Sequence, residues 1–172
     1  MSQTAIKQIF IPATLVYLET AAGEVLMLHR NKNPQDLHWG KYNGLGGKME
    51  AHESAYECAQ REVFEEAGLH IPLNKFELKG ILFFPEFDQQ LRHWQVFVFK
   101  ALLTAKPTTL QENYEGSLVW VARDQITQLN LWPGDYHFIP KLWQAGLFKG
   151  KIVYENGILK SYEFYEEAVN LL

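Results

Sequence analysis

Cysteine is almost missing from the chain, since Cys58 is the only one in 172 residues. No intrachain disulfide can form, which fits a reducing compartment. Long apolar runs are missing too, because no segment approaches the ~20 apolar residues of a membrane span. The apolar stretch at residues 9–18 is short and lacks a cleavage signature, so we do not expect a signal peptide. These absences predict a soluble cytoplasmic protein.

An excess of positive charge is missing as well. The formal net charge is −4, and the basic residues form no cluster. The molecule as a whole is therefore not an electrostatic trap for nucleic acid. We expect a small-molecule ligand, no stable nucleic-acid binding and no obligate protein partner. Any polyanion that the protein handles should be held locally, through a metal ion.

Low-complexity segments, internal repeats and Ser/Gly linkers are also absent. Apolar residues make up 47% of the chain and charged residues 21%, which is ordinary for a globular protein. The length suffices for one compact domain with a hydrophobic core. We therefore expect a single domain over residues 1–172, with a mixed α/β fold.

Apolar periodicity and turn residues define the expected elements. Ser54 and Glu57 form a capping box at a helix start, and Gly68 is a natural terminator at its end. Asn156-Gly157 predicts a type I′ hairpin turn. The elements are strands at residues 9–19, 24–30, 76–84, 92–103 and 117–122, helices at 54–67, 123–129 and 133–146, a hairpin at 151–164, and a long loop at 31–47.

Three glutamates stand at the end of the clearest helix, where negative charge is unfavourable. Glu62, Glu65 and Glu66 are neighbours at helical spacing and should repel one another. Each also faces the negative end of the helix dipole, at a cost of ~0.3–1 kcal/mol. Arg61 can offset part of this by pairing with Glu65.

A charged, solvated helix face is the simpler interpretation of these acids. However, Glu62 and Glu66 share a side of the helix with the small residues Ala55, Cys58 and Ala59, so this side should pack inward. Carboxylates without His or Cys suit a hard cation, Mg²⁺ or Mn²⁺. A bound cation would turn the repulsion into attraction.

The segment that contains these glutamates resembles the Nudix box. That pattern is Gly, five residues, Glu, seven residues, Arg-Glu, an aliphatic residue, any residue, Glu-Glu, any residue, Gly and an aliphatic residue. The sequence matches it at every specified position, with Gly47, Glu53, Arg61, Glu62, Val63, Glu65, Glu66, Gly68 and Leu69. Nine constrained positions make the resemblance highly specific.

Resemblance to the Nudix family implies an α/β/α sandwich with a mixed sheet and a loop–helix–loop catalytic motif. It implies hydrolysis of a nucleoside diphosphate linked to another group, with Mg²⁺ as cofactor and Mn²⁺ as a possible substitute. The implied metal ligands in the box are Glu62, Glu65, Glu66 and the carbonyl of Gly47. Glu53 and Arg61 would brace the motif, and a nearby carboxylate would take the proton of the attacking water.

The loop before the box is similar to that of MutT-type diphosphatases, which hydrolyse 8-oxo-dGTP to the monophosphate and pyrophosphate. This similarity implies that Asn43 reads the purine edge, that Trp132 stacks on the base and that Asp135 hydrogen-bonds it. Lys48 would touch phosphate. The simpler interpretations are a turn residue for Asn43, core packing for Trp132, a helix-start acid for Asp135 and a surface lysine for Lys48.

Three further positions bear on the resemblance. A loop glutamate before the strand at 117–122 often joins the metal ligands in the family, which implies Glu115, with Glu112 as competitor. His52 stands where many relatives have Gly, so a positive φ there would be strained. Gly134 stands where some relatives have the first of two adjacent acids, which leaves the purine preference open.

We therefore expect Mg²⁺-dependent hydrolysis of nucleoside triphosphates that sanitises oxidised purine nucleotides such as 8-oxo-dGTP. The alternatives keep the chemistry and change the substrate to another nucleoside triphosphate, a nucleotide sugar, a dinucleoside polyphosphate or an RNA 5′ end. A Nudix-fold binding module without catalysis ranks last, because no glutamate of the box is lost.

Overall fold

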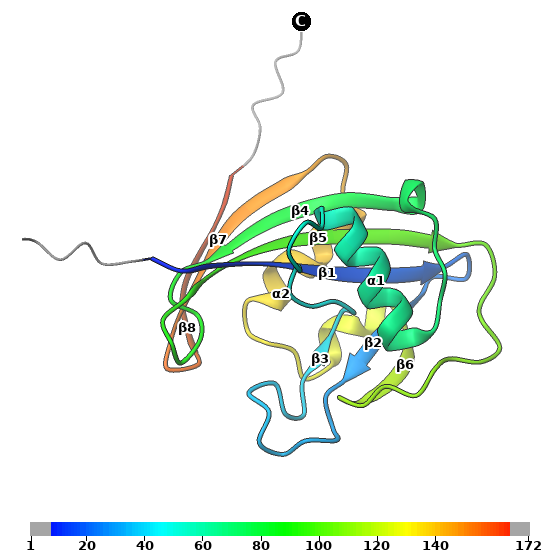
Figure 1. Cartoon of the computed structure of the whole chain (residues 1–172), viewed down its shortest axis with the longest axis horizontal. Coiled ribbons are helices and arrows are strands. Elements are labelled where there is room, and N and C mark those ends of the chain that lie inside the picture. The colour runs from blue at the N-terminus through cyan, green and yellow to red at the C-terminus, as the bar shows by residue number, and fades with distance from the viewer. Residues whose placement is uncertain (1–7, 166–172) are drawn as a thin grey trace, which may run out of the picture.

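The computed structural model describes residues 8–165, in which eight strands form one mixed sheet (Figure 1). The strands are β1 (Phe10–Thr20), β2 (Glu24–His29), β3 (Tyr42–Asn43), β4 (Phe76–Phe84), β5 (His93–Leu103), β6 (Ser117–Ala122), β7 (Phe148–Glu155) and β8 (Ile158–Tyr165). The helices are α1 (Ala55–Ala67) and α2 (Asp135–Phe138), with 3-10 turns at Leu73–Lys75, Arg123–Gln128 and Ile139–Trp143.

The strand order shows why the sheet is mixed. It runs β3-β2-β1-β5-β4-β7-β8, and β6 pairs with β2 outside this path. β1 and β5 are parallel along the whole of β1, from Phe10 opposite His93 to Thr20 opposite Leu103. β4 and β7 are also parallel, whereas the remaining pairs are antiparallel. The predicted mixed α/β sheet is confirmed.

Each face of the sheet buries its own hydrophobic cluster. Side chains alternate along β1, so that Val16 and Leu18 pack toward α1 while Tyr17 packs toward the opposite face. α1 contributes Ala59 and Val63 to the first cluster. The second cluster includes residues of α2 and of the neighbouring 3-10 turns. The sheet therefore lies between α1 and α2 (Figure 1), as expected for an α/β/α sandwich.

The ends of α1 follow the predicted capping chemistry. Ser54 Oγ accepts a hydrogen bond from the Glu57 backbone N–H at 3.3 Å, and Glu57 Oε2 accepts one from the Ser54 N–H at 2.8 Å. Gly68 ends the helix in the left-handed conformation, with φ 71°. The predicted hairpin turn is also confirmed, because Asn156 and Gly157 both have positive φ, at 51° and 76°.

Two predicted elements differ from the structure. The long loop at 31–47 contains the short strand β3, which pairs with β2. The helix expected at 133–146 is instead α2 followed by the 3-10 turn. Pro140 explains the break, because it has no N–H to continue an α-helix and its ring would clash with the preceding turn.

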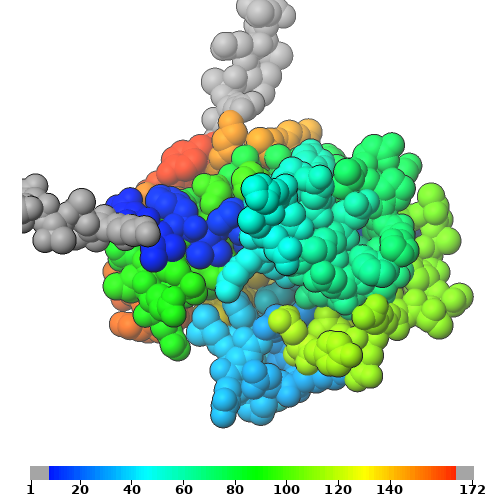
Figure 2. All heavy atoms as spheres, viewed as in Figure 1, coloured from blue at the N-terminus to red at the C-terminus, as the bar shows by residue number. Residues whose placement is uncertain are grey.

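The loops beside the sheet come together at one edge. Lys32 Nζ donates to Glu112 Oε1 at 2.7 Å and to the Asn113 carbonyl at 2.9 Å. Figure 2 shows these two segments side by side below α1. Among the described residues, no helix is long and apolar enough to cross a membrane.

Candidate active site

A cavity of about 880 Å³ opens between α1, the loop before it, the loop before β6 and the start of α2. It is large enough for a small-molecule ligand. The cavity gathers most of the residues that the sequence singles out: Asn43, Gly47, Lys48, Arg61, Glu62, Glu65, Glu66, Glu115, Trp132 and Asp135. Glu53 does not line the cavity, but it binds Arg61, which does.

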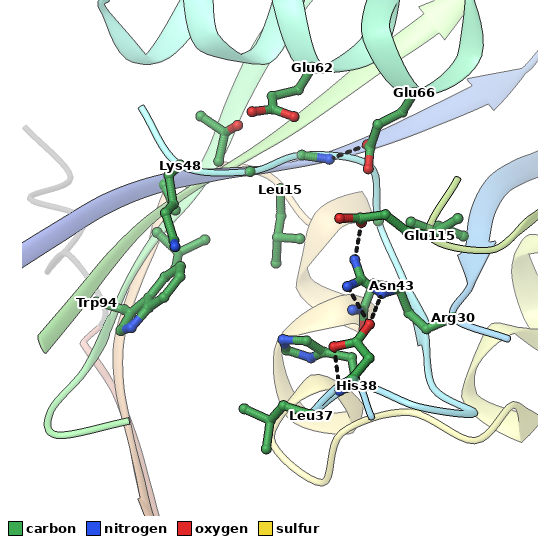
Figure 3. A pocket seen from close by; sticks show the side chains of 18 of the residues that line it. Leu15, Arg30, Leu37, His38, Asn43, Lys48, Glu62, Glu66, Trp94 and Glu115 are labelled. Carbon is green, nitrogen blue, oxygen red and sulfur yellow. Dashed lines mark hydrogen bonds and ion pairs between the residues drawn. The ribbon is translucent and has the colours of Figure 1, made fainter. Parts of the chain in front are cut away.

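Glu62 and Glu66 point from α1 into one end of the cavity (Figure 3). Glu66 is only 9% exposed and accepts a hydrogen bond from the Gly46 N–H at 2.7 Å. Burial raises the pKa of Glu66 to about 8; the Gly46 hydrogen bond opposes this shift, and the charges of Glu115 and Glu62 add to it. Burial also raises the pKa of Glu62. The inward placement of these two acids is as predicted.

Glu65 is the most exposed of the three box glutamates. Its side chain is 54% exposed, and it pairs with Arg61 Nη1 at 3.1 Å, while Glu62 meets the same nitrogen at 2.8 Å. Across residues 8–165, no three acidic, His or Cys side chains are already grouped as a metal-binding cluster. All three box carboxylates line the cavity, as expected, and Glu62 and Glu65 share Arg61 Nη1, but the three are not yet gathered around one point.

The glycines before α1 let the backbone approach these acids. A Cβ at Gly47 would stand 2.5 Å from Glu62 Oε1, so any side chain there would displace the carboxylate. The Gly47 carbonyl accepts a hydrogen bond from the Thr14 N–H at 2.8 Å, which ties the loop to β1. At Gly46, φ is 139° and a Cβ would lie 2.2 Å from the Thr14 carbonyl oxygen. Only glycine fits this crossing.

Arg61 and Glu53 brace the loop against α1. Arg61 Nε meets Glu53 Oε1 at 2.6 Å, and Nη2 meets Oε2 at 3.0 Å and the Lys48 carbonyl at 3.1 Å. The Arg61 hydrogen bonds hold the pKa of Glu53 at about 2. His52, between these elements, has φ 70°. His52 therefore has the positive φ that would be strained for a residue other than glycine.

The structure distinguishes Glu115 from Glu112. Glu115 lines the cavity and forms an ion pair with Arg30. The buried Asn113 fixes its backbone, since Asn113 Oδ1 accepts from the Glu115 N–H at 2.8 Å. Glu112 has an 82% exposed side chain, pairs with Lys32 and lies outside the cavity lining. The geometry favours Glu115 as the loop acid of the site.

Arg30 is a site residue that sequence reasoning missed. Its Nε donates to Asp36 Oδ2 at 2.7 Å, so the guanidinium bridges Asp36 and Glu115 (Figure 3). A basic residue directly after a buried strand was the only local signal. Its partner Glu115 is 85 residues away in sequence.

The acidic end of the cavity fits a hard divalent cation. Carboxylate oxygens of Glu62, Glu66 and Glu115 face it, and the Gly47 backbone passes beside Glu62 without a side chain between them. Oxygen-only donors match the preference of Mg²⁺ and Mn²⁺. The raised pKa of Glu66 shows that burial disfavours its ionised form, and a bound cation would stabilise that form.

The opposite end of the cavity is aromatic and contains Trp132. Its ring makes edge contacts with His38, Phe87 and Tyr154, and Lys41 Nζ stands 5.6 Å from its centroid. His38, Phe87 and Tyr154 carry no sequence motif and were also missed. The result is an apolar wall with few polar groups, which is typical of a site for a flat ligand.

Asp135 and Asn43 supply polar groups near this wall. Asp135 is the first residue of α2, is 8% exposed and lines the cavity. Burial raises its pKa to about 8, with the charge of Lys41 opposing the shift. No group within residues 8–165 donates a hydrogen bond to its carboxyl. Asn43 lies on β3, opposite Leu28 of β2, and lines the same cavity.

Gly134 cannot be replaced by a second acid without rearrangement. Its N–H donates to Tyr154 Oη at 2.6 Å, and a Cβ would stand 2.7 Å from that oxygen and 2.8 Å from Ile152 Cγ2. Asp135 is therefore the only acid at this edge of the described cavity.

On the opposite wall, Lys48 is exposed and places its Nζ 5.5 Å from the centroid of Trp94 (Figure 3).

Known proteins resemble this chain in sequence and in fold. A family model described as the NUDIX domain matches residues 10–142. An oxidized purine nucleoside triphosphate hydrolase from Mus musculus is 32% identical over 118 residues, which cover 68% of this chain and 72% of that protein. An uncharacterized Nudix hydrolase from Bacillus subtilis (strain 168) is 34% identical over 112 residues, covering 63% and 69%. The crystal structure of a mutator MutT protein from Bacillus halodurans superposes with a TM-score of 0.77 at 29% identity, covering 92% of this chain and 99% of that one.

Proposed function

Because the chain belongs to the Nudix hydrolase family, we propose that it hydrolyses nucleoside triphosphates to the monophosphate and pyrophosphate in a Mg²⁺-dependent reaction. We further propose that it sanitises oxidised purine nucleotides such as 8-oxo-dGTP. The observation that carries the proposal is a single cavity with an acidic, oxygen-donor end and an aromatic end. A nucleotide has the matching polarity, with phosphates at one end and a flat base at the other.

The acidic end would hold the cation. Glu62, Glu66, Glu115 and the Gly47 carbonyl are the ligands we propose, with Glu65 joining once Arg61 releases it. When bound, the ion neutralises phosphate charge and lowers the pKa of an attacking water. Nudix enzymes generally use a divalent metal. We propose which oxygen atoms of this chain would bind it.

The side chains around this end orient the reacting groups. Arg61 and Glu53 fix the loop and α1 relative to each other, which keeps Glu62 in place. We assign proton acceptance from water to the Glu62–Glu65 pair, because both carboxylates reach the cavity. Lys48 lines the same cavity and would contact phosphate after leaving Trp94.

The aromatic end would hold the base. Trp132 offers an aromatic surface, which supports base stacking worth ~1–3 kcal/mol. Asn43 and a protonated Asp135 each offer a donor and an acceptor for the base edge. The named activity of the mouse relative, an oxidized purine nucleoside triphosphate hydrolase, supports a purine here.

The substitution Glu62→Gln tests the catalytic assignment. It keeps the volume of the side chain and removes its charge, so we expect kcat to fall by a factor on the order of 10² or more without loss of fold. Glu112→Gln is the matched control, because Glu112 is an exposed acid outside the cavity. Steady-state kinetics with Mg²⁺ and circular dichroism would be measured on both variants. Full activity of Glu62→Gln would reject the assignment.

A second candidate keeps the hydrolysis and changes the nucleotide. Gly134 favours it, because this position leaves no room for a second acid beside Asp135. A site with one acid makes fewer contacts to the purine edge, so another nucleoside triphosphate or nucleoside diphosphate derivative becomes the competing substrate. Relative kcat/KM values across a nucleotide panel separate the two candidates.

A further inference from the structure

A hydrogen bond between two ring nitrogens connects the loop after β2 with the segment before α2. The Trp132 indole N–H donates to His38 Nδ1 at 2.8 Å, and the two rings meet edge-on with centroids 5.6 Å apart. The backbone N–H of His38 donates to Asp36 Oδ1 at 3.0 Å, which fixes the backbone at His38. Both rings line the cavity.

This hydrogen bond determines which tautomer His38 adopts. An indole nitrogen can only donate, so His38 Nδ1 must be unprotonated in order to accept. The neutral imidazole then carries its proton on Nε2, where it is a donor. A protonated His38 would present N–H groups at both nitrogens and would lose the bond to Trp132.

The surroundings keep His38 in the neutral form. Burial lowers its pKa and the nearby Arg30 lowers it further, while Asp36 acts in the opposite direction. Lys41, whose ammonium stands over Trp132, adds another positive charge near the pair. Asp135 lines the same cavity, and burial raises its pKa to about 8, which favours the uncharged acid and so reduces the negative charge near His38.

The second ring nitrogen of His38 has no protein partner. Within residues 8–165, the polar contacts of the His38 side chain consist of the bond from Trp132 to Nδ1 alone. The imidazole lies in the cavity beside Leu37 and Asn43, on the side opposite Glu62 (Figure 3). A donor in the cavity that the protein leaves unpaired is available to a ligand.

We propose that His38 is a specificity-determining residue whose Nε2–H donates to a keto oxygen of the substrate's base, in the tautomer that Trp132 imposes. This inference rests on the proposed function, because it requires a base at Trp132. Asn43 and Asp135 can each donate or accept, whereas His38 Nε2 in this tautomer only donates. It therefore selects oxo-purine nucleotides over those with an amino group at the same position.

Two substitutions separate the donor role of His38 from its contact with Trp132. His38→Gln can place an amide N–H near the position of Nε2 but loses the acceptor at Nδ1. His38→Asn keeps an oxygen near Nδ1 and does not reach the position of Nε2. If His38 reads the base, the Gln variant keeps the specificity and the Asn variant loses it. If His38 only accepts the hydrogen bond from Trp132, the Asn variant keeps the specificity and the Gln variant loses it.

The probes are 8-oxo-dGTP, dGTP and 2-aminopurine deoxyribonucleoside triphosphate. dGTP lacks the keto oxygen that 8-oxo-dGTP has at position 8. The 2-aminopurine nucleotide lacks the keto oxygen that dGTP has at position 6. In the wild type we expect one of these differences to lower kcat/KM by about three- to tenfold, as for the loss of one hydrogen bond. In His38→Asn the ratio of kcat/KM between the same two nucleotides should fall to near one. In His38→Gln the wild-type ratio should persist.

Equal kcat/KM ratios in the wild type and both variants would overturn the proposal, as would persistence of the ratio in His38→Asn with its loss in His38→Gln. These results differ from failure of the proposed function. That failure would appear as wild-type protein without Mg²⁺-dependent turnover of any of the three nucleotides, and it would remove the basis for a base contact at His38 as well.

Discussion

Asp135 offers a sharp physical test, because it is a buried acid without a hydrogen-bond donor in the described part of the chain. Burial raises its pKa from 3.8 to about 8. The substitution Asp135→Asn keeps the shape and the capacity to donate and accept, but it removes the ionisation. We expect it to change how stability depends on pH while preserving the proposed polar contact to a base.

The sign follows from proton linkage. The folded protein holds a proton on Asp135 that the unfolded chain releases above about pH 4, so rising pH favours unfolding until the folded group also ionises near pH 8. One proton over roughly three pH units, from about pH 5 to pH 8, corresponds to as much as roughly 4 kcal/mol. Asn has no proton to release. The stability of Asp135→Asn relative to wild type should therefore rise across this range.

Urea unfolding at about pH 5, 6.5 and 8, with a chelator present, would measure this difference. Glu66, whose pKa is also about 8, contributes equally to both proteins and cancels. Asp124→Asn is the control, since Asp124 is exposed on the 3-10 turn at Arg123–Gln128. If the stability of Asp135→Asn relative to wild type stays constant with pH, or falls as the pH rises from about 5 to about 8, Asp135 does not have the raised pKa.

Three further predictions follow from the site. Glu115→Gln should weaken Mg²⁺ activation, seen as a higher Mg²⁺ concentration for half-maximal rate, whereas Glu112→Gln should leave it unchanged; equal effects would remove Glu115 from the metal ligands. Trp132→Ala should raise KM for a purine nucleotide on the order of tenfold, and unchanged kinetic constants would reject stacking. Gly134→Ala should cost about 1–3 kcal/mol in chemical denaturation, because its Cβ would meet Tyr154 Oη at 2.7 Å; a neutral result would contradict that packing.

The catalytic helix could be predicted from sequence because its signals are local. Ser54, Glu57 and Gly68 define α1 within one short segment, and the structure has the helix at Ala55–Ala67 with those caps. The strands at 76–84 and 117–122 were likewise predicted with the bounds that the structure shows. Local rules of spacing and turn chemistry decide such elements.

The partners of the site residues could not be predicted in the same way. Arg30 pairs with Glu115 and His38 with Trp132, at separations of 85 and 94 residues. Nothing in the neighbourhood of either residue encodes those contacts, since they depend on how loops converge at a sheet edge. The two-residue strand β3 also exists only because β2 lies beside it. Tertiary packing decides such features.

Measurement of kcat/KM on a nucleotide panel would test the proposed Mg²⁺-dependent hydrolysis of oxidised purine nucleoside triphosphates. The panel is 8-oxo-dGTP, dGTP, dATP, dCTP, ADP-ribose and a diadenosine polyphosphate, each with Mg²⁺ and with a chelator. We predict the highest kcat/KM for 8-oxo-dGTP, release of pyrophosphate, and loss of turnover without the metal. A preference for ADP-ribose or the diadenosine polyphosphate would contradict the proposed substrate, and equal turnover with the chelator would contradict the proposed metal dependence.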